Sequence, residues 1–159
     1  MDSKGESSET GHRRKVETRI WLQILSLEST IFGRLNSALS AQHGLSVAKF
    51  EFLAQVDRYP EGITLGKISE NLKVTSGNVS GLVRRLLADG LITKKMSAQD
   101  RRSFIVRFTP KGRKLFDKAN ALHITTLATC FGEIPVSDLE QSLAALRFLS
   151  THLQGHSNG

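Results

Sequence analysis

Residues 62–92 have the sequence GITLGKISENLKVTSGNVSGLVRRLLADGLI, and this stretch decides the fold. Thr64 is a typical N-cap, and the apolar spacing after it predicts a short helix over Leu65–Leu72. A tight turn of three residues separates it from a second predicted helix, Ser76–Asp89. Gly90 then supplies the left-handed residue that commonly ends a helix. Two helices joined in this way make a helix-turn-helix, whose second helix is able to enter a DNA major groove.

A β-hairpin is predicted directly after the second helix. The runs Leu91–Lys95 and Ser103–Phe108 have the composition of strands, and a polar loop joins them. The loop ends in Asp100-Arg101-Arg102, which places one carboxylate beside two guanidinium groups. Such a tripeptide is usually just a solvated turn. Between two strands that follow a helix-turn-helix, it indicates a wing whose arginines can enter a narrow minor groove.

Further helices are predicted on both sides of this core. Apolar residues recur at three- and four-residue steps over Val16–Gln42, which predicts a long amphipathic helix. Its stripe consists of Val16, Ile20, Ile24, Leu27, Ile31, Leu35 and Leu39. The other helices are expected to begin at Ser46, at Thr109-Pro110 and at a capping box over Ser137–Glu140, and to end before Pro60, near Cys130 and near Leu153. The fold class is therefore mainly α with a small β-hairpin wing.

Residues 1–12 are rich in Ser, Glu and Gly, and we expect them to form a disordered tail. The remaining residues, 13–159, are predicted to form a single winged-helix domain with 46–114 as its DNA-binding core. We see no internal repeat and no second domain boundary in the sequence.

The positive charge is concentrated in the same part of the chain. The net charge is +7, but residues 64–114 contain twelve Lys and Arg against three acidic residues. The rest of the chain has ten basic and twelve acidic residues, so it is slightly negative. A phosphate backbone would therefore be attracted to residues 64–114 and not to the remainder.

Other classes of protein find little support in the sequence. No apolar run is long enough to cross a bilayer, and the polar N-terminus does not resemble a secretory signal. With Cys130 as the single cysteine, an intramolecular disulfide is excluded, and a cytoplasmic location is the simplest setting. The five histidines show no metal-ligand spacing, so we expect no metal and no cofactor. No phosphate-binding glycine loop or nucleophile elbow is present, so we expect no enzyme activity.

The second helix of the helix-turn-helix carries the candidate base-reading groups. Small hydrogen-bonding side chains at its start suit bases and nearby phosphates, and the later arginines suit phosphates or a guanine edge. The candidate DNA contacts are Thr75, Ser76, Asn78, Ser80, Arg84 and Arg85 on this helix, with Asp100, Arg101 and Arg102 in the wing. Gly77 and Gly81 are unusual inside a helix. Either a close approach to DNA or a tight contact with a neighbouring helix would explain them.

Several short patterns in this order resemble the MarR family of bacterial transcriptional regulators. They are Ile63-Thr64-Leu65 through Ile68, Val74 to Ser80, Val83 to Leu87 followed by Asp89-Gly90-Leu91-Ile92, Asp100-Arg101-Arg102-Ser103, and Thr109-Pro110-Lys111-Gly112. The resemblance implies a homodimer on a pseudo-palindromic double-stranded DNA operator, with 13–45 and 115–153 as dimerisation helices. It also implies that Arg102 lies in the minor groove and that Asp100 orients it. The Gly77-Asn78-Val79 variant is similar to that of members controlling aromatic-acid degradation, some of which respond to aromatic acyl-CoA thioesters.

The same resemblance implies a small-molecule effector bound between the dimerisation helices and the winged domain. Candidate lining residues are Trp21, Arg34, His43, Phe50 and Arg84. Each has an ordinary alternative: Trp21 suits a dimer core, Arg34 a surface cation, and His43 a helix end stabilised by the dipole. Some relatives sense oxidants through a thiol, but Cys130 is predicted to be structural, because the dipole at a helix C-terminus disfavours the reactive thiolate.

We therefore expect a ligand-responsive DNA-binding regulator, most commonly a repressor in the family that this chain resembles. Two alternatives stay open. A winged helix can serve as a protein-interaction module, although such surfaces usually show aromatic or Leu anchors. A non-specific DNA-binding protein would differ in its ratio of specific to non-specific affinity.

Overall fold

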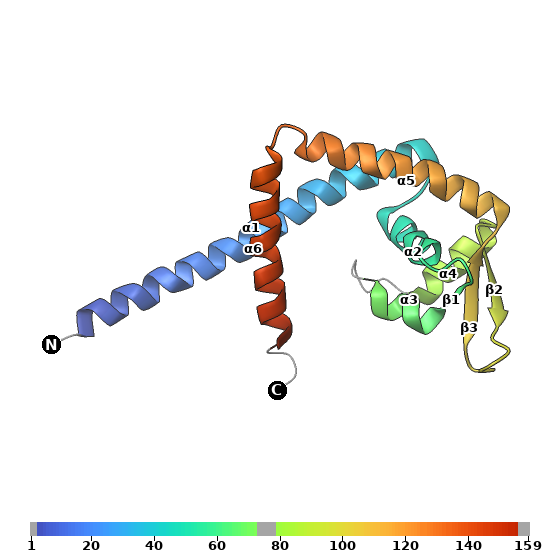
Figure 1. Ribbon diagram of the computed structural model, residues 1–159, viewed down its shortest axis with the longest axis horizontal. Helices are drawn as coiled ribbons and strands as arrows, with labels where there is room; N and C mark the ends of the chain where they lie inside the picture. The colour runs from blue at the N-terminus through green and yellow to red at the C-terminus, as the bar shows by residue number, and fades with distance from the viewer. Residues whose placement is uncertain (1–2, 73–78, 156–159) are drawn as a thin grey trace. The chain divides into compact units, whose positions relative to one another are not determined.

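The structure is a computed structural model that describes residues 3–72 and 79–155 (Figure 1). The elements are α1 (Ser3–His43), α2 (Val47–Asp57), β1 (Ile63–Thr64), α3 (Leu65–Asn71), α4 (Val79–Ala88), β2 (Ile92–Met96), β3 (Phe104–Phe108), α5 (Pro110–Phe131) and α6 (Val136–Gly155). The chain divides into two compact units, one up to Thr126 and one from Leu127 onwards. The first contains the helix-turn-helix and the hairpin, so the architecture is the expected winged helix-turn-helix with mainly helical structure.

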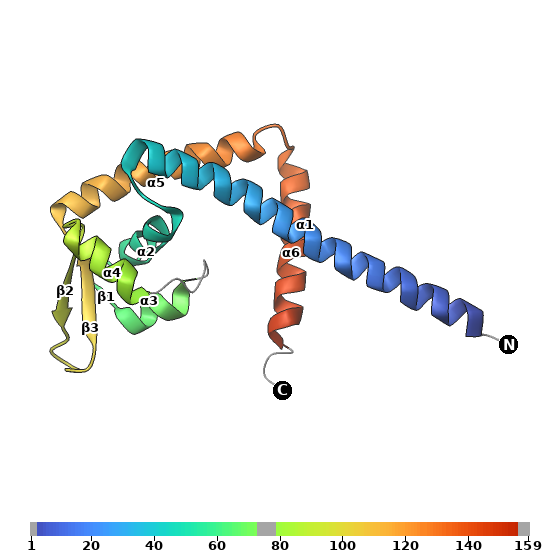
Figure 2. The same cartoon turned by 180° about the vertical axis from the view of Figure 1, so that it is seen from behind.

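The sheet has three antiparallel strands in the order β1-β3-β2. β2 and β3 form the predicted hairpin, with Ile92 opposite Phe108 and Met96 opposite Phe104. β1 is a third strand that the sequence analysis did not predict, since it has only two residues and pairs Ile63 with Val106. This pairing joins the base of the wing to the start of α3. Both views show α2, α3 and α4 gathered beside the sheet (Figures 1 and 2).

The hydrophobic core of the first unit is drawn from the end of α1, from α2 to α4, from the three strands and from α5. Its largest fully buried side chains are Phe52, Leu39, Leu45, Leu53, Ile68, Leu86, Val56 and Val106. On α4, Leu82, Val83 and Leu86 are buried, as the apolar spacing predicts. Leu87 was expected on the same face but is 37% exposed, because it lies at the edge of the buried stripe.

Three of the predicted N-caps and the glycine that ends α4 are confirmed. The Ser46 hydroxyl accepts a hydrogen bond from the Lys49 backbone N–H at the start of α2, and Thr64 does the same for Lys67 in α3. The Thr109 hydroxyl accepts from the Gly112 N–H at 2.9 Å and caps α5. Gly90 has φ of 69°, so it ends α4 in the left-handed conformation.

Three sequence-based expectations differ from the structure. α1 begins at Ser3, so Ser3–His12 are helical where we expected a disordered tail; no proline interrupts the segment, and helix extends readily along an existing helix. α6 begins at Val136, before the expected capping box, because the Pro135 carbonyl already accepts the Leu139 N–H. The third difference is the second compact unit from Leu127, where we expected none. The helix α6 within it has no buried residue, so it adds no core of its own.

Within the described part of the chain, no helix combines the length and apolar character needed to span a membrane.

Candidate nucleic-acid interface

α4 separates a buried face from a polar, cationic one. Leu82, Val83 and Leu86 face the core, whereas Ser80, Arg84 and Arg85 are exposed. The three described candidates on this helix therefore lie on the side that is free to meet DNA. The other candidates, Thr75, Ser76 and Asn78, and with them Gly77 and the turn before them, lie outside the described residues. Gly81 is buried, which favours the close-packing explanation for this glycine.

The wing tip is held by hydrogen bonds that involve its main chain. Asp100 Oδ1 accepts the backbone N–H of Arg102 at 2.9 Å, and the Asp100 carbonyl accepts the N–H of Ser103 at 2.9 Å. The Ser97 hydroxyl, at the buried start of the loop, accepts the N–H of Gln99 at 3.2 Å. Asp100 thus acts on Arg102 through the backbone rather than through the guanidinium group. Arg101 and Arg102 are both left exposed at the tip.

Cationic side chains also pack along the hairpin. Lys94 Nζ lies 4.2 Å from the centre of the Phe104 ring, a cation–π contact across β2 and β3. Arg107 Nη2 donates a hydrogen bond to the Glu61 carbonyl just before β1. Gly62, between Glu61 and β1, has φ of 104°, and a Cβ there would lie 2.4 Å from a methyl group of Ile105. Only glycine therefore suits the close crossing of the β1 approach over β3.

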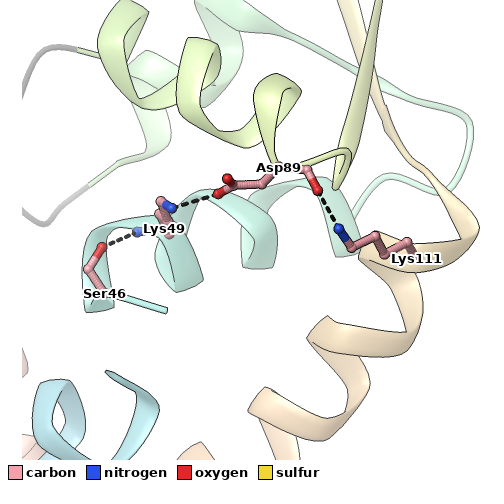
Figure 3. Close-up of polar contacts among 4 residues, drawn as sticks. All are labelled: Ser46, Lys49, Asp89 and Lys111. Atoms are coloured by element: carbon pink, nitrogen blue, oxygen red, sulfur yellow. Dashed lines mark hydrogen bonds and ion pairs between the residues drawn. The ribbon is translucent and has the colours of Figure 1, made fainter. Parts of the chain in front are cut away.

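The end of α4 is connected to two other helices by one acidic residue (Figure 3). Lys49 Nζ of α2 lies 2.7 Å from Asp89 Oδ2, and Lys111 Nζ of α5 donates to the Asp89 carbonyl oxygen at 2.8 Å. We call these three residues the Asp89 clamp. The sequence analysis placed Asp89 in a family-like motif but assigned it no role. The sequence did contain one signal that Asp89 has a special role: a carboxylate stands at a helix C-terminus, where the helix dipole disfavours negative charge.

The turn after α4 also lies directly against the first turn of α5. Thr109 Oγ1 donates to the Gly90 carbonyl at 2.6 Å, and the Thr109 N–H donates to the Leu91 carbonyl at 3.1 Å. A Cβ on Gly112 would come within 1.8 Å of the Leu91 oxygen. The start of α5 and the start of the wing are therefore in backbone contact.

An aromatic column connects α2, β3 and α5. Phe50 stacks on Phe116 with ring centres 5.5 Å apart and on His123 at 4.6 Å, and Phe116 lies 5.5 Å from Phe108. Burial lowers the pKa of His123 below its ordinary value, although the nearby Glu51 carboxylate partly opposes this.

Arg113 lies over the Phe108 end of this column, 4.3 Å from the ring centre. It binds the carboxylates of Asp57 and Asp117, and the hydrogen bond to Asp57 is the main reason why the pKa of Arg113 is raised. The column is thus capped by a charged group that links α5 to the end of α2.

The five candidate ligand residues lie in different surroundings in the structure. Phe50 is only 3% exposed and belongs to the aromatic column. Trp21 and Arg34 are exposed on α1, and Arg84 is exposed on α4. His43 borders an open hollow of about 330 Å³, which is lined by His43, Gly44, Leu45, Lys49, Asp89, Leu91, Lys111 and Leu115. The lysines of this hollow were not among our candidates.

The described residues contain no group of His, Cys, Asp and Glu side chains suited to hold a metal ion. Cys130 is partly buried near the end of α5. What the described surface offers is a set of exposed cations on a helix and a hairpin, an arrangement suited to a phosphate backbone and base edges.

Comparisons with known proteins agree with this geometry. The MarR family sequence model matches residues 43–103. A crystal structure of a MarR family transcriptional regulator from Silicibacter pomeroyi is 40% identical, covers 89% of this chain and 97% of its own, and superposes with a TM-score of 0.79. The HTH-type regulator YkoM of Bacillus subtilis is 27% identical over 116 residues, 72% of this chain and 74% of its own.

A more distant structure shares the fold. CouR from Rhodococcus jostii RHA1, solved with p-coumaroyl-CoA bound, is 23% identical, with a TM-score of 0.70 over 82% of this chain and 90% of its own. The relatives named here are regulators and not enzymes, in line with the function class expected from the sequence. The winged fold, the 40% identity along nearly the whole Silicibacter protein and the family match agree, and this chain belongs to the MarR family of transcriptional regulators.

Proposed function

We propose that this regulator is a homodimeric repressor that binds a pseudo-palindromic operator and is released by a small aromatic acid or its CoA thioester. The observation that carries the proposal is the division of α4 into a buried apolar face and an exposed face with Ser80, Arg84 and Arg85, followed directly by a wing with two exposed arginines. A helix and a neighbouring hairpin of this kind can contact a major groove and the adjacent minor groove together.

On this proposal α4 lies in the major groove. Arg84 and Arg85 meet phosphates or a guanine edge, Ser80 supplies a hydroxyl, and Thr75, Ser76 and Asn78 are expected to read bases at the start of the helix. The wing places Arg102 in the minor groove, where the potential is most negative, with Arg101 near the backbone. Asp100 keeps the tip in shape through its bond to the Arg102 N–H.

The apolar stripe of α1 supports a dimer. Leu35 and Leu39 are buried in the core, but Leu27 is 47% exposed, and Ile20 and Ile24 are each 38% exposed. A second exposed set on α6 consists of Leu143, Leu146, Phe148 and Leu153. Large exposed apolar surfaces of this kind usually mark protein interfaces. We therefore assign residues 13–45 and 115–153 to dimerisation and 46–114 to DNA binding.

We infer the effector class from the ligand of a protein with the same fold. CouR, which shares the fold, was solved with an aromatic acyl-CoA. In the present chain, Trp21, Arg34, His43, Phe50 and Arg84 remain the proposed lining residues. Of these, His43 lies at a hollow with nearby lysines, whereas Phe50 is buried and is not among the residues that line this hollow.

The test is a fluorescence-anisotropy titration of purified protein against DNA from its own upstream region and against random DNA of equal length. It is run at near-physiological salt, with and without aromatic acids and their CoA thioesters. We expect tight, sequence-preferring binding that one compound releases, and a dimer by light scattering. Equal and salt-labile affinity for both DNAs would instead favour a non-specific binder. Absence of DNA binding would favour a protein-interaction module.

A further inference from the structure

Asp89 occupies a position where a carboxylate is electrostatically disfavoured. It follows Ala88, the last residue of α4, and its N–H still donates to the Arg85 carbonyl at 2.9 Å. The C-terminal end of a helix carries partial negative charge, so an acidic residue there lowers helix stability. A lysine or arginine at this position would stabilise the helix, and it would also add positive charge to a face that binds DNA. The Asp89 carboxylate therefore needs an interaction that offsets this loss of helix stability.

The compensating groups come from two helices that do not belong to the helix-turn-helix (Figure 3). The ammonium group of Lys49 reaches the Asp89 carboxylate from the first turn of α2, at 2.7 Å. Its own backbone N–H is held by the Ser46 cap at 3.2 Å, and its side chain is only 18% exposed. Lys111 reaches the Asp89 carbonyl from the first turn of α5. A long, flexible lysine side chain is thus ordered at the cost of its conformational entropy.

The two halves of the Asp89 clamp do different things. The bond from Lys111 ends on a main-chain oxygen and adds to the Thr109 and Gly112 contacts that already hold the turn against α5. The bond from Lys49 ends on the carboxylate and adds a link between the end of α4 and α2. A substitution of the Asp89 side chain therefore removes the ion pair with α2 and leaves the contacts with α5 in place.

From this arrangement we propose that Asp89 is a positioning residue for operator binding. Through Lys49 it fixes the C-terminal end of α4 against α2, and so directs Arg84 and Arg85, one helical turn earlier, toward the DNA. This inference rests on the proposed function of α4 as the recognition helix. It assigns to Asp89 no contact with DNA.

The direction in which operator affinity changes on substitution of Asp89 distinguishes a positioning role from a purely electrostatic one. Asp89→Asn removes one negative charge from the basic stretch 64–114, which by charge alone would strengthen binding to a polyanion. Loss of a positioning contact predicts the opposite. We expect operator binding to weaken about two- to fivefold, the range that one partly exposed ion pair can supply.

Asp117→Asn is the matched control. It removes the same charge from an exposed residue of the same unit, and Arg113 keeps its stronger partner Asp57. Its operator affinity should equal that of the wild type or exceed it slightly. The exchange variant Lys49→Asp/Asp89→Lys retains the pair with reversed charges and leaves the net charge unchanged. It should recover most of the affinity that Asp89→Asn loses.

The decisive experiment measures two quantities on the full-length wild type, the Asp89→Asn and Asp117→Asn variants and the exchange variant. Operator affinity is measured by anisotropy, and amide hydrogen exchange over residues 79–88 is measured without DNA. We expect exchange in α4 to be about threefold or more faster in Asp89→Asn and normal in the control, with unfolding midpoints close to the wild type. If Asp89→Asn shows wild-type exchange in α4, or binds operator as tightly as Asp117→Asn, the positioning role is wrong. Failure of the wild type to bind any DNA would refute the proposed function instead, and exchange would still decide whether Asp89 holds α4.

Discussion

Replacing Gly112 with alanine should destabilise the protein, although alanine is the better helix former. The added Cβ would lie 1.8 Å from the Leu91 carbonyl oxygen and 2.7 Å from its carbon. Real Cβ atoms essentially never come within 3.0 Å of such atoms, so α5 and the turn must separate by about 1 Å or more. Because the obstacle is backbone, no side-chain rotation can relieve it.

The expected size follows from three contributions. Overpacking typically costs about 1–3 kcal/mol, and a rigid obstacle places this substitution at the upper end. Separation also weakens the two hydrogen bonds from Thr109 to Gly90 and Leu91, each contributing about 1 kcal/mol. The better helix propensity of alanine returns up to about 1 kcal/mol. We therefore expect a net loss of about 2–4 kcal/mol in the free energy of unfolding, a large fraction of a typical total of about 5–15 kcal/mol.

Urea unfolding followed by far-UV circular dichroism measures this loss. Gly66→Ala is the control, because Gly66 is exposed in α3 and a Cβ there meets nothing within 4 Å. That variant should gain a few tenths of a kcal/mol up to about 1 kcal/mol. If Gly112→Ala were as stable as the wild type, or gained stability like the control, the backbone contact between α5 and the wing would be refuted.

Three further substitutions test other parts of the molecule. Arg102→Ala should weaken operator binding about tenfold or more while thermal stability stays unchanged, and unaltered affinity by anisotropy would contradict the wing assignment. Leu27→Asp should yield a monomer by light scattering, since it places a charge in the exposed stripe of α1; a DNA-competent dimer would exclude this interface. Burial lowers the pKa of His123 below its ordinary value of 6.5, so the unfolded chain takes up the proton first and stability falls as pH drops below about 6.5. His123→Phe keeps a ring against Phe50 and should reduce this fall in denaturation midpoints between pH 7 and 5, whereas an unchanged pH dependence would show that His123 does not cause it.

Local signals predicted the boundaries of the elements well. Thr64, Ser46 and Thr109 each cap the helix that the sequence assigned to them, because a cap depends on a hydroxyl and on the N–H groups within one turn. β1 was missed for the opposite reason. Two residues carry no periodicity, and Ile63 becomes part of a strand only because Val106 lies beside it.

Periodicity identified the apolar stripe of α1 but not what covers it. Leu39 is fully buried and Leu27 is 47% exposed, although both belong to one stripe with the same spacing. The hydrophobic pattern of a helix records that a face is to be buried, and it is the same whether the cover is the chain's own core or another subunit. The fold of one chain therefore shows which part of the stripe is already covered, and the exposed remainder becomes the basis for the dimer proposal.

Polar partners were the hardest part of the site to predict. The sequence placed a carboxylate beside two arginines at the wing tip, and we expected the Asp100 carboxylate to hold the side chain of Arg102. The structure shows the Arg102 N–H as its partner, because an Asp two residues before an amide in a tight turn is well placed to accept from the main chain. Lys49 and Asp89 are 40 residues apart in the sequence, and neither position shows a pattern that would pair them.

The attachments of α4 and of the wing differ in stiffness, and this difference bears on how a signal could pass through the domain. The wing begins at Leu91, whose carbonyl is in backbone contact with the first turn of α5, so a displacement of that turn must displace the wing. The polar link between the end of α4 and α2 is a partly exposed ion pair, which can break at a small free-energy cost and leave α4 held by its buried face. A movement of the first turn of α5 would therefore be transmitted to the start of the wing more directly than to the body of α4. On the proposed mode of DNA binding, a change in the spacing between the α4 arginines and Arg102 would disturb the simultaneous contact of both grooves, so a displacement at the junction of Asp89, Leu91 and Gly112 is expected to lower DNA affinity.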